Sequence, residues 1–171
     1  MVELRHILYL CTGNSARSII AEAVTNRIGR GRVRAFSAGS RPAGRVNPQA
    51  LELLIDLGYA TADLRSKSWT EFSEPGAPAM DLVVTLCDEA AGESCPIWPG
   101  HPLTAHWGIP DPAAAKNARA IRAALADAHR VIETRVHRLL DLPISALDQA
   151  GLRQHLNNID DDRMLIAAWS R

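Results

Sequence analysis

Two residue types that act together on oxyanions, a cysteine and an arginine, lie close together near the start of the chain. Cys11 ends a short apolar run, and Arg17 follows after the five residues 12–16, where a pattern of helical period begins. A loop that leads from a strand into a helix N-terminus presents unpaired backbone N–H groups, which bind anions. The planar guanidinium of Arg17 can hold two oxygens of a tetrahedral oxyanion. Because a helix N-terminus and a nearby cation favour the thiolate of Cys11, this stretch predicts a cysteine nucleophile in an anion cradle.

The residues around this pair are mostly small and polar, as an anion cradle requires. We expect Gly13 to turn the backbone with a positive φ and to let it approach the anion closely. Asn14 is expected to brace the loop through hydrogen bonds to the backbone. Ser18 either donates a hydrogen bond to the Cys11 thiolate or is a simple capping serine. The alternative for Cys11 itself is a buried structural cysteine. The predicted substrate-binding set comprises Thr12, Gly13, Asn14, Ser15, Ala16, Arg17 and Ser18.

Two further cysteines can take part in chemistry. Cys87 ends a second apolar run, and Cys95 follows in a stretch rich in proline and glycine. Three cysteines are an odd number for a secreted disulfide framework, and thiols in a reducing compartment are more often catalytic, redox-active or metal-binding than structural. The alternatives are two unrelated cysteines or a zinc site completed by His101 and His106. Because the spacings Cys-x7-Cys and His-x4-His are not typical of structural zinc sites, we expect no bound metal.

The elements that must position these residues alternate along the chain. Apolar patterns predict strands over residues 4–10, 33–38, 80–87 and 104–109, and helices over residues 15–28, 47–57, 114–141 and from residue 145 onward. This alternation predicts one α/β domain, a parallel sheet with helices on both faces. Ligands of such sheets bind beyond the carboxyl ends of the strands. Four residues that follow or finish the strands are therefore expected to share one rim: Cys11, Ser37, Cys87 and Asp111.

Composition limits the function classes. The 171 residues suit a single domain, and 19 Lys and Arg balance 19 Asp and Glu, so no overall positive field argues for nucleic acid or an anionic membrane. The N-terminal residues are too charged for a signal peptide, and no apolar run reaches membrane-spanning length. We therefore expect a cytoplasmic protein with no nucleic-acid or membrane partner.

The loop residues 11–18, together with Ala21-Glu-Ala23, resemble the phosphate loop shared by low-molecular-weight protein tyrosine phosphatases and the arsenate reductases built on that fold. The resemblance covers roughly residues 4–140. It implies a four-stranded parallel sheet flanked by helices, with Cys11 as nucleophile and Arg17 as oxyanion clamp. We accordingly expect a phosphatase-like domain over residues 1–142 and a C-terminal helical extension over residues 143–171, packed on the same domain. Further motifs that carry the resemblance are Phe36-Ser-Ala-Gly39, Val46-Asn-Pro48, Asp81-Leu-Val-Val-Thr-Leu-Cys87 and His106-Trp-Gly-Ile-Pro-Asp-Pro112.

The resemblance to arsenate reductases implies a thiol relay without a cofactor. Cys11 would attack arsenate, with Asp111 protonating the leaving oxygen. Cys87 would then attack Cys11, releasing arsenite and leaving a Cys11–Cys87 disulfide. Cys95 would attack Cys87, and the resulting Cys87–Cys95 disulfide would be reduced by thioredoxin, or by glutaredoxin with a low-molecular-weight thiol.

Two other functions use the same loop. A phosphatase acting on aryl phosphates would need Cys11, Arg17 and the acid Asp111, but Asp111-Pro112 is followed by Ala113, where phosphatases usually carry an aromatic residue. An oxyanion- or arsenic-sensing module could use the C-terminal addition as a partner surface. The sensing module is disfavoured because no residue needed for catalysis is missing. Because two further cysteines are present and the aromatic residue after Asp111-Pro112 is not, we predict an arsenate reductase, with the phosphatase as the alternative.

The resemblance also raises the question of a cation. Relatives of the relay type sometimes bind potassium behind the loop, with residues at positions like Asn14, Glu22 and Ser37 and a carboxylate near position 68. This chain has Ser68 there, so the resemblance does not decide whether a cation binds.

Overall fold

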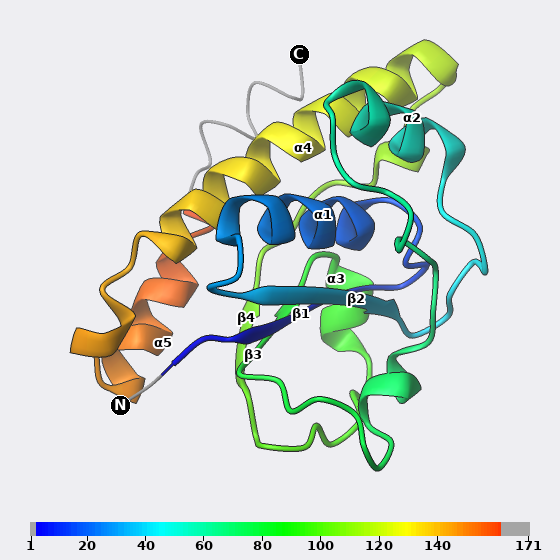
Figure 1. The fold of residues 1–171 in the computed structure, drawn as a ribbon. Coiled ribbons are helices and arrows are strands. Elements are labelled where there is room, and N and C mark those ends of the chain that lie inside the picture. Colours follow the sequence, from blue (N-terminus) through cyan, green and yellow to red (C-terminus); the bar gives the residue numbers. More distant parts are fainter. Residues whose placement is uncertain (1–2, 162–171) are drawn as a thin grey trace.

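The computed structural model describes residues 3–161, which contain a four-stranded parallel sheet. Its strands are β1 (His6–Cys11), β2 (Arg34–Gly39), β3 (Leu82–Thr85) and β4 (Leu103–His106), in the order β2-β1-β3-β4 (Figure 1). Every pairing is parallel, so the carboxyl ends of all four strands lie at one rim. The predicted fold class is confirmed. The observed strands start or end up to three residues from the predicted bounds, which is usual at element ends.

Both faces of the sheet are covered, which explains why β1 is almost continuously apolar. Ile7 and Tyr9 face the larger core, whereas Leu8 and Leu10 face the other side, and all four are fully buried. Because successive side chains of a strand alternate between faces, a strand buried on both sides needs an unbroken apolar run.

The larger core lies under the long helices. α1 (Arg17–Gly29), α2 (Pro48–Asp56) and α4 (Ala118–Leu140) pack on one side of the sheet (Figure 1). On the opposite side the 3₁₀ turn η1 (Trp69–Phe72) and irregular segments bury Met80 and Trp98 against Leu8 and Leu10. No helix within residues 3–161 combines the length and apolar character needed to cross a bilayer.

Two differences from the predicted elements lie beside the rim. The stretch after Cys87, expected to be irregular, contains a one-turn helix, α3 (Asp88–Gly92). The long helix begins at residue 118 rather than 114, because the Asn117 side chain accepts a hydrogen bond from the N–H of Ala120 and so caps it there. A 3₁₀ turn, η2 (Pro112–Ala114), precedes that cap.

The C-terminal segment packs on the sheet beside β4. Its elements are η3 (Ile144–Ala146) and α5 (Gln149–Asn158), and the cap of α5 is Asp148, whose carboxylate accepts from the N–H of Gly151. Leu152 and Leu156 belong to the larger core, and the Trp107 indole donates to the Leu156 carbonyl at 3.4 Å. The last ten residues of the expected extension, 162–171, lie outside the described part.

Candidate active site

The loop between β1 and α1 is held with its carbonyl groups turned outward. The carbonyl oxygens of Thr12, Gly13 and Ser15 accept hydrogen bonds of 3.0, 2.8 and 2.9 Å from backbone N–H groups of the neighbouring segment 41–47. These three carbonyls are therefore bonded to a neighbouring segment and not to N–H groups of the loop itself. This arrangement suits an anion cradle.

The sharp turn of the loop occurs at Asn14 rather than at Gly13. Asn14 has a φ of 44°, whereas Gly13 is not among the residues with positive φ, so the expected positive φ of Gly13 was wrong. Asparagine tolerates the left-handed region better than most residues do. Its side chain is fully buried and holds this conformation: Oδ1 accepts from the N–H of Lys67 at 2.9 Å, and Nδ2 donates to Ser18 Oγ at 2.8 Å.

Gly39 allows the end of β2 to approach the loop. A Cβ placed at this position would lie 2.4 Å from the Thr12 carbonyl oxygen and 3.0 Å from atoms of Asn14. Any other side chain would therefore push the two segments apart.

The sulfur of Cys11 lies in a directed hydrogen-bond chain. Ser18 Oγ lies 2.9 Å from Cys11 Sγ, and the same oxygen accepts from Asn14 Nδ2. Since the Ser18 oxygen already accepts from the amide, its own proton is available for the cysteine sulfur. Of the two sequence interpretations of Ser18, the geometry therefore favours donation to the Cys11 thiolate.

The N-terminus of α1 has no side-chain cap, unlike the other α-helices within residues 3–161. Asn47, Cys87, Asn117 and Asp148 cap α2, α3, α4 and α5, whereas Ala16 precedes α1 and provides no such bond. An oxyanion seated in the cradle would supply the missing acceptor.

Arg17 is the first residue of α1 and is held towards the rim. Its Nη1 donates to the Ile109 carbonyl at 2.9 Å, and its Nη2 lies 3.9 Å from Asp111 Oδ1. Asp111 is fixed in turn by the N–H of Ala113, which donates to Oδ1 at 3.0 Å. Arg17, Asp111 and Cys87 line one cavity of about 440 Å³. Of the four residues expected at the rim, Cys87 and Asp111 thus lie together, and Cys11 shares a buried cluster with Cys87. The expectation was wrong for Ser37, whose hydroxyl donates to Glu22 behind the loop.

Cys87 lies against the cradle and caps α3. Its sulfur accepts from the N–H of Ala90 at 3.4 Å, and the Thr12 hydroxyl lies 3.5 Å from it. Cys11, Cys87 and Ala90 form a small buried cluster of their own. Two thiols that are 76 residues apart in the chain thus share one site, which thiol–disulfide exchange requires.

Cys95 is placed differently. It lies beyond the end of α3, is exposed, and does not belong to the buried cluster of the other two cysteines. Although the residue is exposed, the protein atoms around its thiol partly desolvate it and raise its pKa, and the negative charge of Glu93 raises the pKa further. Of the predicted site residues, Cys95 is the one that the structure leaves apart from the cradle.

The acidic residues of the segment 88–93 each contact a different neighbour. Asp88 Oδ1 lies 2.9 Å from His106 Nε2, Glu89 accepts from the Thr12 hydroxyl at 3.3 Å, and Glu93 lies 3.5 Å from Arg41. Of these contacts, the one between Glu89 and Thr12 joins α3 to the cradle. Within residues 3–161 no group of three or more His, Cys, Asp and Glu side chains is arranged to hold a metal ion.

A buried lysine behind the loop was missed by the sequence analysis. Lys67 Nζ lies 3.7 Å from Glu22 Oε2, and the same carboxylate oxygen accepts from the Ser37 hydroxyl. The Ser68 hydroxyl accepts from the N–H of Thr70 and caps η1. The residues therefore do not fit a potassium site, because an ammonium group lies beside the carboxylate and the expected second carboxylate is absent.

These features define a class. A four-stranded parallel sheet in the order β2-β1-β3-β4, whose central strand ends in a Cys-x5-Arg anion loop, is the arrangement of the small phosphatase-like α/β proteins. Comparison with known proteins gives the family: the sequence model of low molecular weight phosphotyrosine protein phosphatases matches residues 6–155, and the chain belongs to this family.

Several relatives of this chain are named arsenate reductases rather than phosphatases. An arsenate reductase of Bacillus subtilis is 36% identical over 115 residues, which cover 67% of this chain and 79% of that protein. An arsenate reductase of Staphylococcus aureus is 38% identical over 116 residues, covering 66% of this chain and 82% of that protein.

Solved structures agree with this placement. An arsenate reductase of Archaeoglobus fulgidus superposes with a TM-score of 0.58 at 29% identity, over 77% of this chain and 98% of that chain. A thioredoxin-dependent arsenate reductase of Corynebacterium glutamicum gives a TM-score of 0.61 at 25% identity, over 81% of this chain. The match spans 61% of that longer protein. A low-molecular-weight protein tyrosine phosphatase of T. tengcongensis shares the fold, with a TM-score of 0.57 at 22% identity.

Proposed function

We propose that this chain is an arsenate reductase that passes two electrons to arsenate through Cys11, Cys87 and Cys95. The observation that carries the proposal is the buried cluster that Cys87 shares with Cys11 beside an anion loop. A hydrolase of this fold needs a single thiol, whereas a reductase needs a second thiol within reach of the first. The relatives named arsenate reductase support the same conclusion.

The first step forms a covalent adduct. Arsenate occupies the cradle, where backbone N–H groups and Arg17 hold its oxygens. The Cys11 thiolate forms a sulfur–arsenic bond, one arsenic–oxygen bond breaks, and the oxygen leaves as water after taking a proton from Asp111. Asp111 suits this role because it lines the same cavity as Arg17.

The second step is the reduction. The Cys87 thiolate attacks Cys11 Sγ, so that a sulfur–sulfur bond forms and the sulfur–arsenic bond breaks. The electron pair of the broken bond stays on arsenic, which changes from As(V) to As(III) and leaves as arsenite. The Thr12 hydroxyl and the N–H of Ala90 can each donate to the Cys87 thiolate before it attacks.

The third step carries the disulfide outward. The Cys95 thiolate attacks Cys87 Sγ, which frees the Cys11 thiolate and leaves a Cys87–Cys95 disulfide. Because Cys95 is exposed and lies apart from the cradle, the segment 88–94 must rearrange before this attack. A dithiol protein such as thioredoxin then reduces the disulfide, as the name of the Corynebacterium relative suggests; glutaredoxin with a low-molecular-weight thiol is the alternative. Such a cycle belongs in the reducing cytoplasm.

The second candidate is phosphatase activity, which the family assignment favours. It would use Cys11, Arg17 and Asp111 without either of the other cysteines. Ala113 follows the Asp-Pro pair, so no aromatic side chain is supplied there to face a substrate ring.

One set of assays separates the two candidates. Arsenite formation is followed with thioredoxin, thioredoxin reductase and NADPH, and hydrolysis of p-nitrophenyl phosphate is measured in parallel. We expect multiple turnovers of arsenate by the native protein and none by Cys87→Ser, which retains phosphate binding as its folding control. Undiminished arsenite formation by Cys87→Ser, or aryl phosphate hydrolysis as the sole activity, would overturn the proposal.

A further inference from the structure

The carboxylate of Glu22 lies behind the anion loop, and the ammonium group of Lys67 lies beside it. The side chain of Glu22 is 11% exposed and that of Lys67 is 6% exposed, and their charged atoms lie 3.7 Å apart. Ser37, which is fully buried, donates to the same carboxylate oxygen. Burial raises the pKa of Glu22, and the nearby Lys67 opposes that rise. A buried carboxylate is costly unless a countercharge accompanies it.

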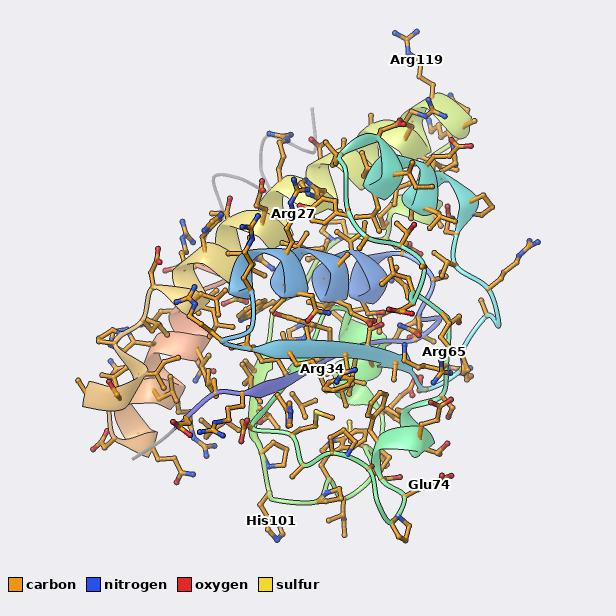
Figure 2. The ribbon with its side chains drawn as sticks, in the orientation of Figure 1. Arg27, Arg34, Arg65, Glu74, His101 and Arg119 are labelled. Carbon is orange, nitrogen blue, oxygen red and sulfur yellow. The ribbon has the colours of Figure 1, made fainter. Side chains whose placement is uncertain are left out.

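Arg65, the other basic residue near Lys67 in the chain, is not the countercharge of Glu22. Arg65, labelled in Figure 2, lies at the surface. Its guanidinium makes two hydrogen bonds of 2.9 and 2.6 Å to Glu71. Lys67 points inward instead, and its Nζ also donates to the Arg65 carbonyl at 3.0 Å.

The backbone of Lys67 connects this ion pair to the cradle. Its N–H donates to Asn14 Oδ1, and its carbonyl accepts from the N–H of Gly39 at 2.9 Å. Asn14 is the residue that turns the loop with positive φ and that donates to Ser18, the partner of the Cys11 sulfur. A shift of Lys67 would therefore reach the nucleophile through two side chains.

We infer that Lys67 is a positioning residue whose ammonium group takes the place of a bound monovalent cation behind the anion loop. The loop is then ordered by the chain itself, and oxyanion binding does not require added potassium. A closed path does not exclude potassium from this position, because Glu22 and Lys67 line a cleft of about 910 Å³ that an ion could enter. The inference does not depend on arsenate reduction, since the cradle of a phosphatase would be ordered in the same way.

The test uses two readouts that are independent of turnover: the affinity for inorganic phosphate and the midpoint of thermal unfolding. Both are measured in potassium chloride and in choline chloride at equal ionic strength. For the native protein we expect the same midpoint in both salts and affinities within about twofold. Lys67→Met should bind phosphate about tenfold more weakly and unfold about 10 °C lower, because it leaves a buried carboxylate without its partner.

Two further variants distinguish a countercharge from simple packing. Lys116→Met, a change at the only other lysine of the chain, is the exposed control and should match the native protein in both readouts. Glu22→Gln combined with Lys67→Met removes both charges and should recover a large part of the lost midpoint and affinity. The inference is overturned if potassium raises the midpoint of the native protein above its value in choline. It is equally overturned if Lys67→Met behaves like Lys116→Met, or if the double variant is no better than Lys67→Met.

Discussion

The hydroxyl oxygen of Thr12 lies 3.5 Å from the sulfur of Cys87, so a residue of the anion loop directly contacts the second thiol. The same hydroxyl also donates to Glu89 Oε2 at 3.3 Å. Two groups therefore compete for one proton: the Glu89 carboxylate and, once it forms, the Cys87 thiolate. This competition gives the first prediction.

Removing the Thr12 hydroxyl should slow the reduction step without loosening the cradle. In Thr12→Val, which keeps the shape of the side chain, we expect the Cys11–Cys87 disulfide to form about tenfold more slowly, the effect of one hydrogen bond to a charged group. Glu89→Gln should have the opposite effect, because it weakens the competing acceptor. Quenched-flow alkylation measures both rates, with phosphate affinity as the control for the loop. Equal rates in the two variants would contradict this role of the hydroxyl.

Ser18 should control the reactivity of Cys11. Because Asn14 donates to the Ser18 oxygen, the serine proton is directed to the cysteine sulfur. Ser18→Ala removes that donor, and we expect alkylation of Cys11 by iodoacetamide at pH 7 to fall about tenfold. Cys87 and Cys95 are replaced by serine in this experiment, so that Cys11 is the only thiol. A rate equal to that of the parent would mean that Ser18 only fills space.

Glu93 should suppress the reactivity of Cys95. Partial burial and the Glu93 carboxylate both raise the pKa of this thiol, so less thiolate is present at pH 7. Glu93→Gln removes the second cause, and the reaction of Cys95 with a disulfide reagent at pH 7 should become about two- to threefold faster. The difference should vanish at a pH high enough to ionise the thiol in both proteins. Cys11 and Cys87 are replaced by serine here, and a ratio that stays constant with pH would rule out a charge effect.

The penalty for removing the Lys67 charge should depend on pH. Burial raises the pKa of Glu22 above its ordinary value of 4.5, and without Lys67 it would rise further. A carboxyl group whose pKa is raised by folding contributes stability that is present below its unfolded pKa and is lost as the pH rises through its folded pKa. The stability deficit of Lys67→Met should therefore grow from pH 4.5 to about 3 kcal/mol at pH 7.5. Urea unfolding measures it, and the same deficit at both pH values would contradict the assignment.

Site residues that are close together in the sequence or at strand ends could be predicted, whereas side-chain contacts between distant segments could not. Cys11 and Arg17 are joined by a short loop between a strand and a helix, so their spacing alone indicated the cradle. Cys87 and Asp111 followed from a topological rule, because the ends of parallel strands meet at one rim. The contact of Thr12 with Cys87 depends on side-chain packing between segments 75 residues apart, which no local pattern records.

The features that were missed have physical reasons. Lys67 belongs to an irregular segment without periodicity, and its burial arises only when that segment lies against Gly39 at the end of β2. The one available hint was its rarity, since the chain has only two lysines. α3 is a single turn of five residues, too short for a helical apolar pattern, although Asp88 and Glu89 in its first turn are typical of a helix start. At Gly13 the general preference of glycine for positive φ was outweighed by the hydrogen bonds of the buried Asn14 side chain.

The most direct test of the relay is a single turnover without reductant. The reduced native protein is mixed with excess arsenate, free thiols are blocked, and arsenite and the disulfide-linked peptides are measured. The relay predicts one arsenite per protein molecule and a Cys87–Cys95 link, whereas Cys95→Ser should also release one arsenite but stop at a Cys11–Cys87 link. Arsenite released with all three thiols of the native protein still free, or a single turnover that survives in Cys87→Ser, would contradict the account.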